Sequence, residues 1–260
     1  MKIAVYDTDL TDAQWTLVEP LLPPPQHLGR PRTDLRRILN ALLYVPKAGC
    51  PWRLLPKEFP AWQTVYPVFR KWTRAHIGEA LNARLRALVR GRIGKRPRPT
   101  AAILDSQGVR SDPHGGVLGH DAAKKIKGRK RRLRVATLGL WLGVHVTPAC
   151  TPERAGAQAL LARVLPGSAW LRLLWVDGGH TGTAFAAWVR DLRPKLAVTV
   201  VKRSDKANGF TVLARRWVVE PTFGWLMHHR RLVRDHETSS ADAEAFVLLA
   251  ILRIPIRRSA

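Results

Sequence analysis

Two short apolar runs, each followed by an aspartate, constrain most strongly what this chain can fold into. Residues 101–104 precede Asp105, and residues 171–176 precede Asp177 and a pair of glycines. Apolar runs of this length, bounded by turn residues, are typical of buried strands. We therefore expect both aspartates to converge at one edge of a sheet. Each also has a simpler explanation, because Asp is a common turn residue and helix N-cap.

A third isolated acid, Glu220, lies in a segment that is otherwise rich in arginine, aromatic and aliphatic residues. If this segment is helical, Arg216, Glu220 and Gly224 share one face through their spacing of four residues. A buried ion pair between Glu220 and Arg216 is the alternative explanation for the acid. Three such acids in one basic chain favour a shared function.

Three carboxylates in a small space cannot all stay ionised without a counter-charge. Mg²⁺ suits them, because it binds carboxylates together with water and phosphate oxygens. Two such ions, about 4 Å apart, can activate a water or a 3′-hydroxyl and stabilise the leaving oxygen of a phosphodiester. The pattern therefore indicates metal-dependent phosphodiester chemistry at Asp105, Asp177 and Glu220.

The charge balance indicates a polyanionic partner. The chain has 44 lysines and arginines against 19 acids, a formal charge of +25, and such an excess predicts salt-sensitive binding. Ribosomal and membrane-surface proteins share this balance, so charge alone does not select DNA.

The densest basic run spans residues 124–134 and contains no acid. Its eight bases are Lys124, Lys125, Lys127, Arg129, Lys130, Arg131, Arg132 and Arg134. The run leads into an expected strand, so we expect a basic strand edge that contacts DNA phosphates. Charge runs are often only solvated, but eight bases without an acid would repel each other, which favours DNA contact.

Cysteine usage and hydropathy favour a reducing cytosol. Cys50 and Cys150 lie far apart and lack the spacing of metal ligands. The first ten residues are too short and too acidic for a signal peptide, and no apolar run approaches the length of a membrane span. We therefore expect a cytoplasmic protein.

The first part of the chain, residues 1–95, is predicted to be a helical domain. The expected helices are at residues 12–22, 33–45, 62–75 and 77–92. Short helices with basic turns are typical of a helix-turn-helix-like DNA-binding domain. Arg70, Lys71 and Arg74 would then meet phosphates along the third helix. The alternative is a small helical bundle with a solvated basic face.

The second part, residues 96–260, is predicted to be an α/β domain that follows a Gly- and Pro-rich linker. The expected strands are at residues 101–104, 133–140, 141–148, 171–176 and 196–201. The expected helices are at residues 154–164, 181–192, around Glu220, and at 241–253. This order predicts a mixed sheet with helices packed on it.

Several motifs carry a resemblance to a known family. DSQGVRS, WVDGGHTG and RRWVVEPTFGWL followed by RRLVRDHE occur in this order, and they resemble the DDE transposases of bacterial insertion sequences, of the insertion-sequence-five-like group. GRPRTDLRRILNALLYVPKAGCPWRLLP, GHDAAKKIKGRKRRLRVATLGL and VKRSDKANGF are also similar to that group. The resemblance covers nearly the whole chain.

The resemblance implies a catalytic role for Asp105, Asp177 and Glu220 in an RNase H-like domain. It implies cleavage of DNA at the element's ends, with Mg²⁺ or Mn²⁺ as two bound ions, and transfer of the freed 3′-hydroxyl into target DNA. Double-stranded DNA, as terminal inverted repeats and target, is the implied partner, and a homodimer is the implied assembly. Arg216, Arg230, Arg231 and the basic run would hold the strands.

Some positions depart from the family pattern. Pro221 follows Glu220 where arginine is common, so the helix either begins near residue 218 or kinks beside the acid. Histidines stand where tyrosine is frequent, at His120, His180, His229 and His236. Two rival functions therefore stay open: a metal-dependent nuclease or resolvase that cuts without joining, and an inactive DNA-binding protein derived from such an enzyme.

Overall fold

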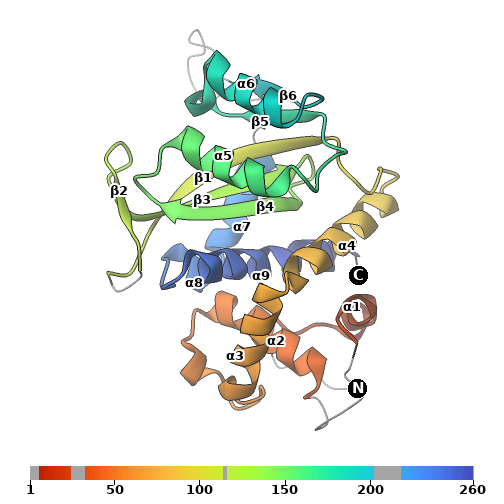
Figure 1. Ribbon diagram of the computed structural model, residues 1–260. Helices are drawn as coiled ribbons and strands as arrows, with labels where there is room; N and C mark the ends of the chain where they lie inside the picture. Colours follow the sequence, from red (N-terminus) through yellow and green to blue (C-terminus); the bar gives the residue numbers. More distant parts are fainter. Residues whose placement is uncertain (1–5, 25–32, 114–115, 202–217, 260) are drawn as a thin grey trace, which may run out of the picture. The chain divides into compact units, whose positions relative to one another are not determined.

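The chain divides into two compact units. The computed structural model describes residues 6–24, 33–113, 116–201 and 218–259 (Figure 1). The first unit comprises Met1–Lys95, Leu226–Arg234 and Ala241–Ala260, and the second comprises Arg96–Trp225 and Asp235–Ser240. Both C-terminal segments of the first unit fall within residues 96–260, which the sequence predicts to form one α/β domain.

The first unit is all-helical in its described residues. Its helices are α1 (Asp12–Val18), α2 (Leu35–Ala48), α3 (Trp62–Arg74), α4 (Ile77–Arg92), α8 (Arg230–Val233) and α9 (Ser240–Ser259), with 3₁₀ turns η1 (Glu19–Leu21) and η2 (Trp52–Leu54). Among the described helices, none is both long and apolar enough to cross a membrane.

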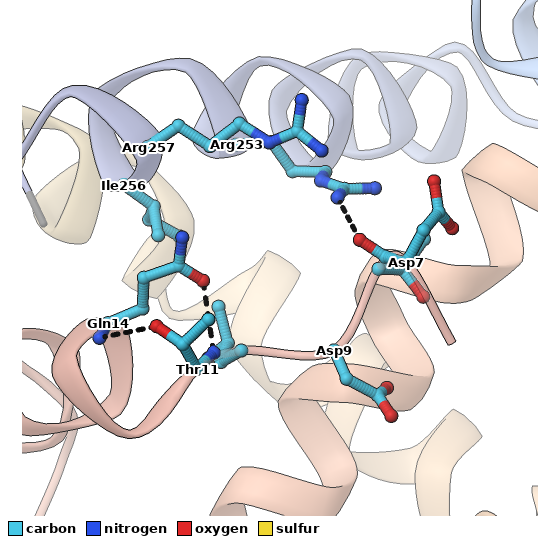
Figure 2. A pocket seen from close by; sticks show the side chains of 9 residues that line it. Asp7, Asp9, Thr11, Gln14, Arg253, Ile256 and Arg257 are labelled. Carbon is cyan, nitrogen blue, oxygen red and sulfur yellow. Dashed lines mark hydrogen bonds between the residues drawn. The ribbon is translucent and has the colours of Figure 1, made fainter. Parts of the chain in front are cut away.

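Helix ends in this unit follow from local capping chemistry. Thr11 accepts a hydrogen bond from the Gln14 backbone, and the Gln14 side chain accepts one from the Thr11 backbone, which forms a capping box at α1 (Figure 2). Thr11 and Gln14 line a small pocket, in which Arg253 of α9 donates a hydrogen bond to the Asp7 carbonyl at 2.6 Å. Gly49 ends α2 in the left-handed conformation, where a side chain would be strained.

Aromatic residues join α3, η2 and α9 in the core of the first unit. Phe246 of α9 stacks on Phe69 of α3 with ring centroids 5.1 Å apart, and Trp52 lies 5.9 Å from Phe246. The guanidinium of Arg231 sits 4.5 Å over the Phe246 ring and donates to the Cys50 carbonyl at 2.9 Å. The C-terminal helix is therefore part of the core of the first unit.

The second unit is built on a mixed sheet. Its strands are β1 (Ala101–Arg110), β2 (Gly119–Asp121), β3 (Ile126–Ala136), β4 (Trp141–Pro148), β5 (Leu173–Val176) and β6 (Ala197–Val200). The strand order is β2-β3-β1-β5-β6, and β4 also pairs with β3. β3 is antiparallel to β1, β2 and β4, whereas β5 runs parallel to β1 and β6 parallel to β5. The predicted mixed sheet is confirmed.

Helices complete the second unit. They are α5 (Glu153–Val164), the 3₁₀ turn η3 (Gly178–His180), α6 (Thr183–Leu192) and α7 (Val219–Met227). α5 packs closely on the sheet, because a side chain on Gly156 would meet the Arg132 guanidinium of β3 at 2.0 Å. Thr222 of α7 donates to the Gly139 carbonyl at 3.4 Å, next to the β3–β4 turn.

Two strand predictions are wrong in their extent. β1 does not stop before Asp105 but continues to Arg110, because residues 105–110 pair with β3. β3 begins at Ile126, so most of the basic run is strand. Both sides of β3 are paired, which means that the run does not form the exposed strand edge that the sequence predicts.

Candidate active site

The strand register indicates that Asp105 and Asp177 lie toward the same edge of the sheet. Ala101 pairs with Leu173 and Ile103 with Trp175 across the parallel β1–β5 ladder. Asp105 and Asp177 have the same offset of 72 residues and follow the last pair of this ladder by two positions. Side chains in a strand alternate between faces, so level residues on adjacent parallel strands point the same way. Neighbouring strands lie about 4.8 Å apart, so we expect two residues that continue this register to lie near each other.

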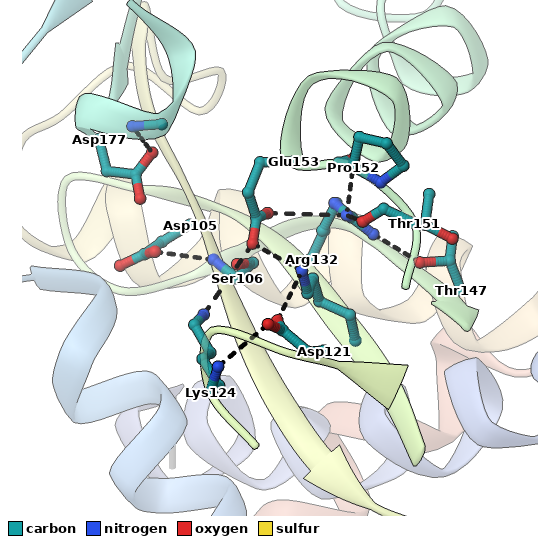
Figure 3. Close-up of polar contacts among 12 residues, drawn as sticks. Asp105, Ser106, Asp121, Lys124, Arg132, Thr147, Thr151, Pro152, Glu153 and Asp177 are labelled. Carbon is teal, nitrogen blue, oxygen red and sulfur yellow. Dashed lines mark hydrogen bonds and ion pairs between the residues drawn. The ribbon is translucent and has the colours of Figure 1, made fainter. Parts of the chain in front are cut away.

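The two aspartates are held differently by the backbone. Asp105 lies inside β1, after the buried Leu104, and its Oδ1 accepts from the Ser106 amide at 2.7 Å. Asp177 follows β5, as predicted, and caps the 3₁₀ turn: its Oδ1 accepts from the Gly179 amide at 3.2 Å and from His180 Nδ1 at 2.6 Å. Figure 3 shows both carboxyl groups in this region.

Glu220 lies in the first turn of α7 and is exposed. Because α7 begins at Val219, Pro221 also falls in the first turn, where proline is tolerated. Within the described residues, no group of three His, Cys, Asp or Glu side chains is arranged to hold a metal ion. The predicted grouping of Asp105, Asp177 and Glu220 around a metal ion therefore stays a prediction. Arg216, the alternative ion-pair partner, lies outside the described residues.

The chemistry of Asp105 and Asp177 suits a divalent cation. Two carboxylates offer the hard oxygen ligands that Mg²⁺ and Mn²⁺ accept, and Mg²⁺ completes its shell with water and phosphate oxygens. Asp105 and Asp177 would hold the ion, and the ion would polarise a phosphodiester and activate its attacker.

A buried ion network lies on the α5 side of β3 (Figure 3). Lys130 Nζ is 3.0 Å from Asp121 Oδ2 and 2.9 Å from Glu153 Oε1. Arg132 Nη2 is 3.6 Å from Glu153 Oε2, and its Nη1 donates to Thr147 Oγ1 at 2.6 Å. The Lys130 hydrogen bond is the largest cause that lowers the pKa of the Asp121 carboxyl. Asp121 and Glu153 are partners of the basic run that its sequence spacing does not indicate.

The opposite face of β3 buries two more arginines. Arg129 is 1% exposed; its Nη1 lies 3.3 Å from Asp235 Oδ2 and donates to the Glu237 carbonyl at 2.7 Å. Arg131 is equally buried, and burial lowers the pKa of its guanidinium to about 10. Asp235 is fixed in turn, because its amide donates to the Arg110 carbonyl at 2.8 Å.

The basic run therefore splits into two parts. Buried members of the run, which the sequence predicts as DNA contacts, are in the interior: Arg129, Lys130, Arg131, Arg132 and Arg134. Their charges meet acids, hydroxyls and carbonyls of the protein, so the interior placement corrects the expectation of a surface track. The exposed members are Lys124, Lys125 and Lys127, which we name the hairpin lysines. They lie in the β2–β3 turn and at the start of β3.

Basic residues of the first unit are also divided. Lys71 and Arg74 of α3 are exposed, as predicted, whereas Arg70 forms an ion pair with Asp242 and is half-buried. Arg230 is exposed, and Arg231 is occupied by Phe246 and the Cys50 carbonyl.

The four family-divergent histidines have different environments. His180 and His229 are buried, at 4% and 1% exposure, and His120 and His236 are exposed. His236 Nδ1 lies 3.4 Å from Asp112 Oδ2. His180 is the one that touches a candidate catalytic acid, Asp177.

A mixed sheet in which the antiparallel strands β1–β4 are followed by the parallel strands β5 and β6, with Asp105 in β1 and Asp177 directly after β5, is the arrangement of an RNase H-like domain. Residues 96–254 match the family model "Transposase DDE domain", and residues 10–82 match "Putative transposase of IS4/5 family". The chain is 33% identical over 117 residues to the "Insertion element IS402 uncharacterized 16.2 kDa protein" of Burkholderia cepacia, which covers 42% of this chain and 78% of that protein. The chain belongs to the DDE transposases of the IS4/5 type.

This membership confirms the predicted family and the RNase H-like fold class. A transposase family implies DNA as the substrate, and DDE transposases generally use divalent metals. The family models also cover the two parts of the chain separately, with the helical residues in one and the sheet in the other.

Proposed function

We propose that this chain cleaves DNA at the ends of an insertion sequence and joins the freed ends to target DNA. The observation that supports the proposal is the parallel pairing of β1 with β5, with Asp105 inside β1 and Asp177 directly after β5. Glu220 would complete the site from α7, and two divalent ions would supply the Lewis-acid chemistry when bound. A homodimer acting on paired ends in the cytoplasm is part of the proposal.

The protein's own residues hold the two aspartates in place and supply cations for the DNA phosphates. Strand pairing fixes the Asp105 backbone, the Ser106 amide donates to the Asp105 carboxylate, and the Gly179 amide donates to the Asp177 carboxylate, so both acids are held before DNA binds. The hairpin lysines are the exposed cations of the basic run, and phosphate contacts from them would hold the strand without reading its sequence. No covalent protein–DNA intermediate is needed.

Cleavage of labelled duplexes that carry the element's ends, with Mg²⁺ or Mn²⁺, tests the proposal. We expect wild-type protein to nick the duplex and to yield joined products. Asp105→Asn keeps the side-chain volume but removes the charge, and it should lower the cleavage rate at least 100-fold while leaving DNA binding intact. Asp191→Asn is the matched control, because Asp191 is an exposed acid on α6 of the same unit.

The same experiment separates two rival functions. Metal-dependent nicking without joined products would indicate a nuclease or resolvase. DNA binding without any cut in either metal would indicate an inactive DNA-binding protein. Cleavage that persists in Asp105→Asn would contradict the three-acid site itself.

A further inference from the structure

His180 is a buried polar side chain beside the candidate site that the proposed chemistry does not use. Its ring is 4% exposed and packs against Phe185 of α6, with ring centroids 5.1 Å apart. Its Nε2 is buried and has no hydrogen-bond partner within the part of the chain that the structure describes. Burying an unpaired ring nitrogen costs free energy. The interaction of the other ring nitrogen, Nδ1, must offset this cost.

The other nitrogen, Nδ1, lies 2.6 Å from Asp177 Oδ1. An ionised carboxylate only accepts hydrogen bonds, so Nδ1 carries the proton and donates. The same Oδ1 accepts from the Gly179 amide at 3.2 Å. Two donors on one oxygen, one from the backbone and one from a ring locked by packing, fix the rotation of the Asp177 carboxyl group.

We propose that His180 is a positioning residue, which orients the Asp177 carboxylate toward a divalent cation. The proposal rests on the proposed function, because it requires that Asp177 hold a metal ion. Groups that hydrogen-bond to a metal-binding side chain typically alter metal affinity by 10- to 100-fold when they are removed. His180 is buried and packs against Phe185, so its Nδ1 donor is held in one place.

Three substitutions separate the donor from the ring. His180→Phe keeps an aromatic ring against Phe185 and removes the donor. His180→Asn carries an amide nitrogen on the γ carbon, as Nδ1 is carried, and so retains a donor in that place. His180→Gln moves the nitrogen one carbon further, to the reach of Nε2, and is the matched control for side-chain polarity.

Mn²⁺ binding to the full-length protein is the measurement, by water-proton relaxation enhancement without DNA. We expect His180→Phe and His180→Gln to bind Mn²⁺ about 10- to 100-fold more weakly than wild type, and His180→Asn to stay within about threefold of it. Thermal melting of each variant checks the fold, and Asp177→Asn and Asp105→Asn define the signal that belongs to the site. If His180→Phe does not fold, the Asn and Gln pair decides.

The outcomes distinguish the two proposals. Equal Mn²⁺ binding by wild type, Asp105→Asn and Asp177→Asn would overturn the metal site and the proposed function with it. A site signal that Asp105→Asn abolishes but His180→Phe leaves unchanged would overturn only the role of His180. Equal weakening by the Asn and Gln variants would also overturn it, because the effect would then come from packing rather than from a donor at Nδ1.

Discussion

At the scale of single residues, the main finding is that a transposase chain with a large basic excess buries some of its most basic side chains. Arg129 is almost fully buried, and its guanidinium is satisfied by Asp235 and three carbonyl oxygens, of Val117, Glu237 and Thr238. A buried ion pair is weak evidence for stability by itself, but removal of one partner leaves the other charge unpaired in the interior. Replacing one partner of a buried ion pair should therefore lower the free energy of unfolding by a measurable amount.

Arg129→Met should lower the free energy of unfolding by about 3–5 kcal/mol, because it leaves the Asp235 carboxylate buried without its guanidinium. Urea denaturation followed by circular dichroism measures the change. Lys127→Met is the matched control on the same strand: Lys127 is exposed, so its replacement should change stability by less than about 0.5 kcal/mol. Equal effects of the two substitutions would contradict the interior role of Arg129.

The buried Asp121 should make stability depend on acid pH. Its pKa is lowered, first by the Lys130 hydrogen bond and then by the Lys124 amide. Its carboxylate therefore adds stability above its unfolded pKa, about 4, and this stability is lost as the pH falls through the lower folded pKa. We expect Asp121→Asn to be less stable at pH 7 and to lose less stability than wild type on acidification below about pH 4. Parallel curves for the two proteins would contradict this.

At the scale of elements, the basic run shows what the sequence can and cannot predict. The apolar run before Asp177 predicted a strand with the acid at its end, and β5 confirms it. The extent of β3 could not be predicted, because the acids that neutralise it, Asp121, Glu153 and Asp235, lie in β2, in α5 and near α8. The basic side chains of β3 are buried on both faces of the sheet only because acids from other segments pair with them, and the spacing of residues in the basic run does not reveal those acids.

The hairpin lysines should carry a salt-dependent part of DNA affinity. Lys124, Lys125 and Lys127 are exposed, and each phosphate contact contributes about −0.9 to the slope of log affinity against log salt. Replacing all three by Met should weaken duplex binding for every sequence and reduce the magnitude of this slope by about 2–3. Fluorescence anisotropy across a salt series measures it. The control is Lys195→Met, an exposed lysine between α6 and β6; an unchanged slope in the triple variant would count against a DNA contact here.

Two glycines in helices should respond in opposite ways to alanine. A side chain on Gly224 of α7 meets nothing within 4 Å, so Gly224→Ala should stabilise the protein by about 0.5–1 kcal/mol. A side chain on Gly156 of α5 would meet the Arg132 guanidinium at 2.0 Å. Gly156→Ala should therefore cost about 1–3 kcal/mol, because the guanidinium must leave Thr147. Chemical denaturation of both variants tests this; stabilisation by both would contradict the close packing of α5.

At the scale of the whole molecule, chain order and compact units do not coincide. Periodicity in the sequence predicted α9, but not that its apolar side would join the N-terminal helices. Phe246 stacks on Phe69, and a side chain on Gly78 of α4 would meet Leu248 at 2.8 Å. Which core an amphipathic helix joins is decided by shape complementarity between distant segments, and hydrophobic periodicity carries no information about it.

The N-terminal helices should consequently depend on the C-terminal segment for stability. We expect a 1–95 fragment to show helical circular dichroism but poor protection from hydrogen exchange, because it lacks the Phe246 ring that packs on Phe69 and Trp52. Joining residues 226–260 through a flexible linker should restore a cooperative thermal transition. The same fusion with Phe246→Ala removes a fully buried ring and should lose about 3–5 kcal/mol. A cooperative, well-protected 1–95 fragment would show instead that α9 only covers a domain that is already complete.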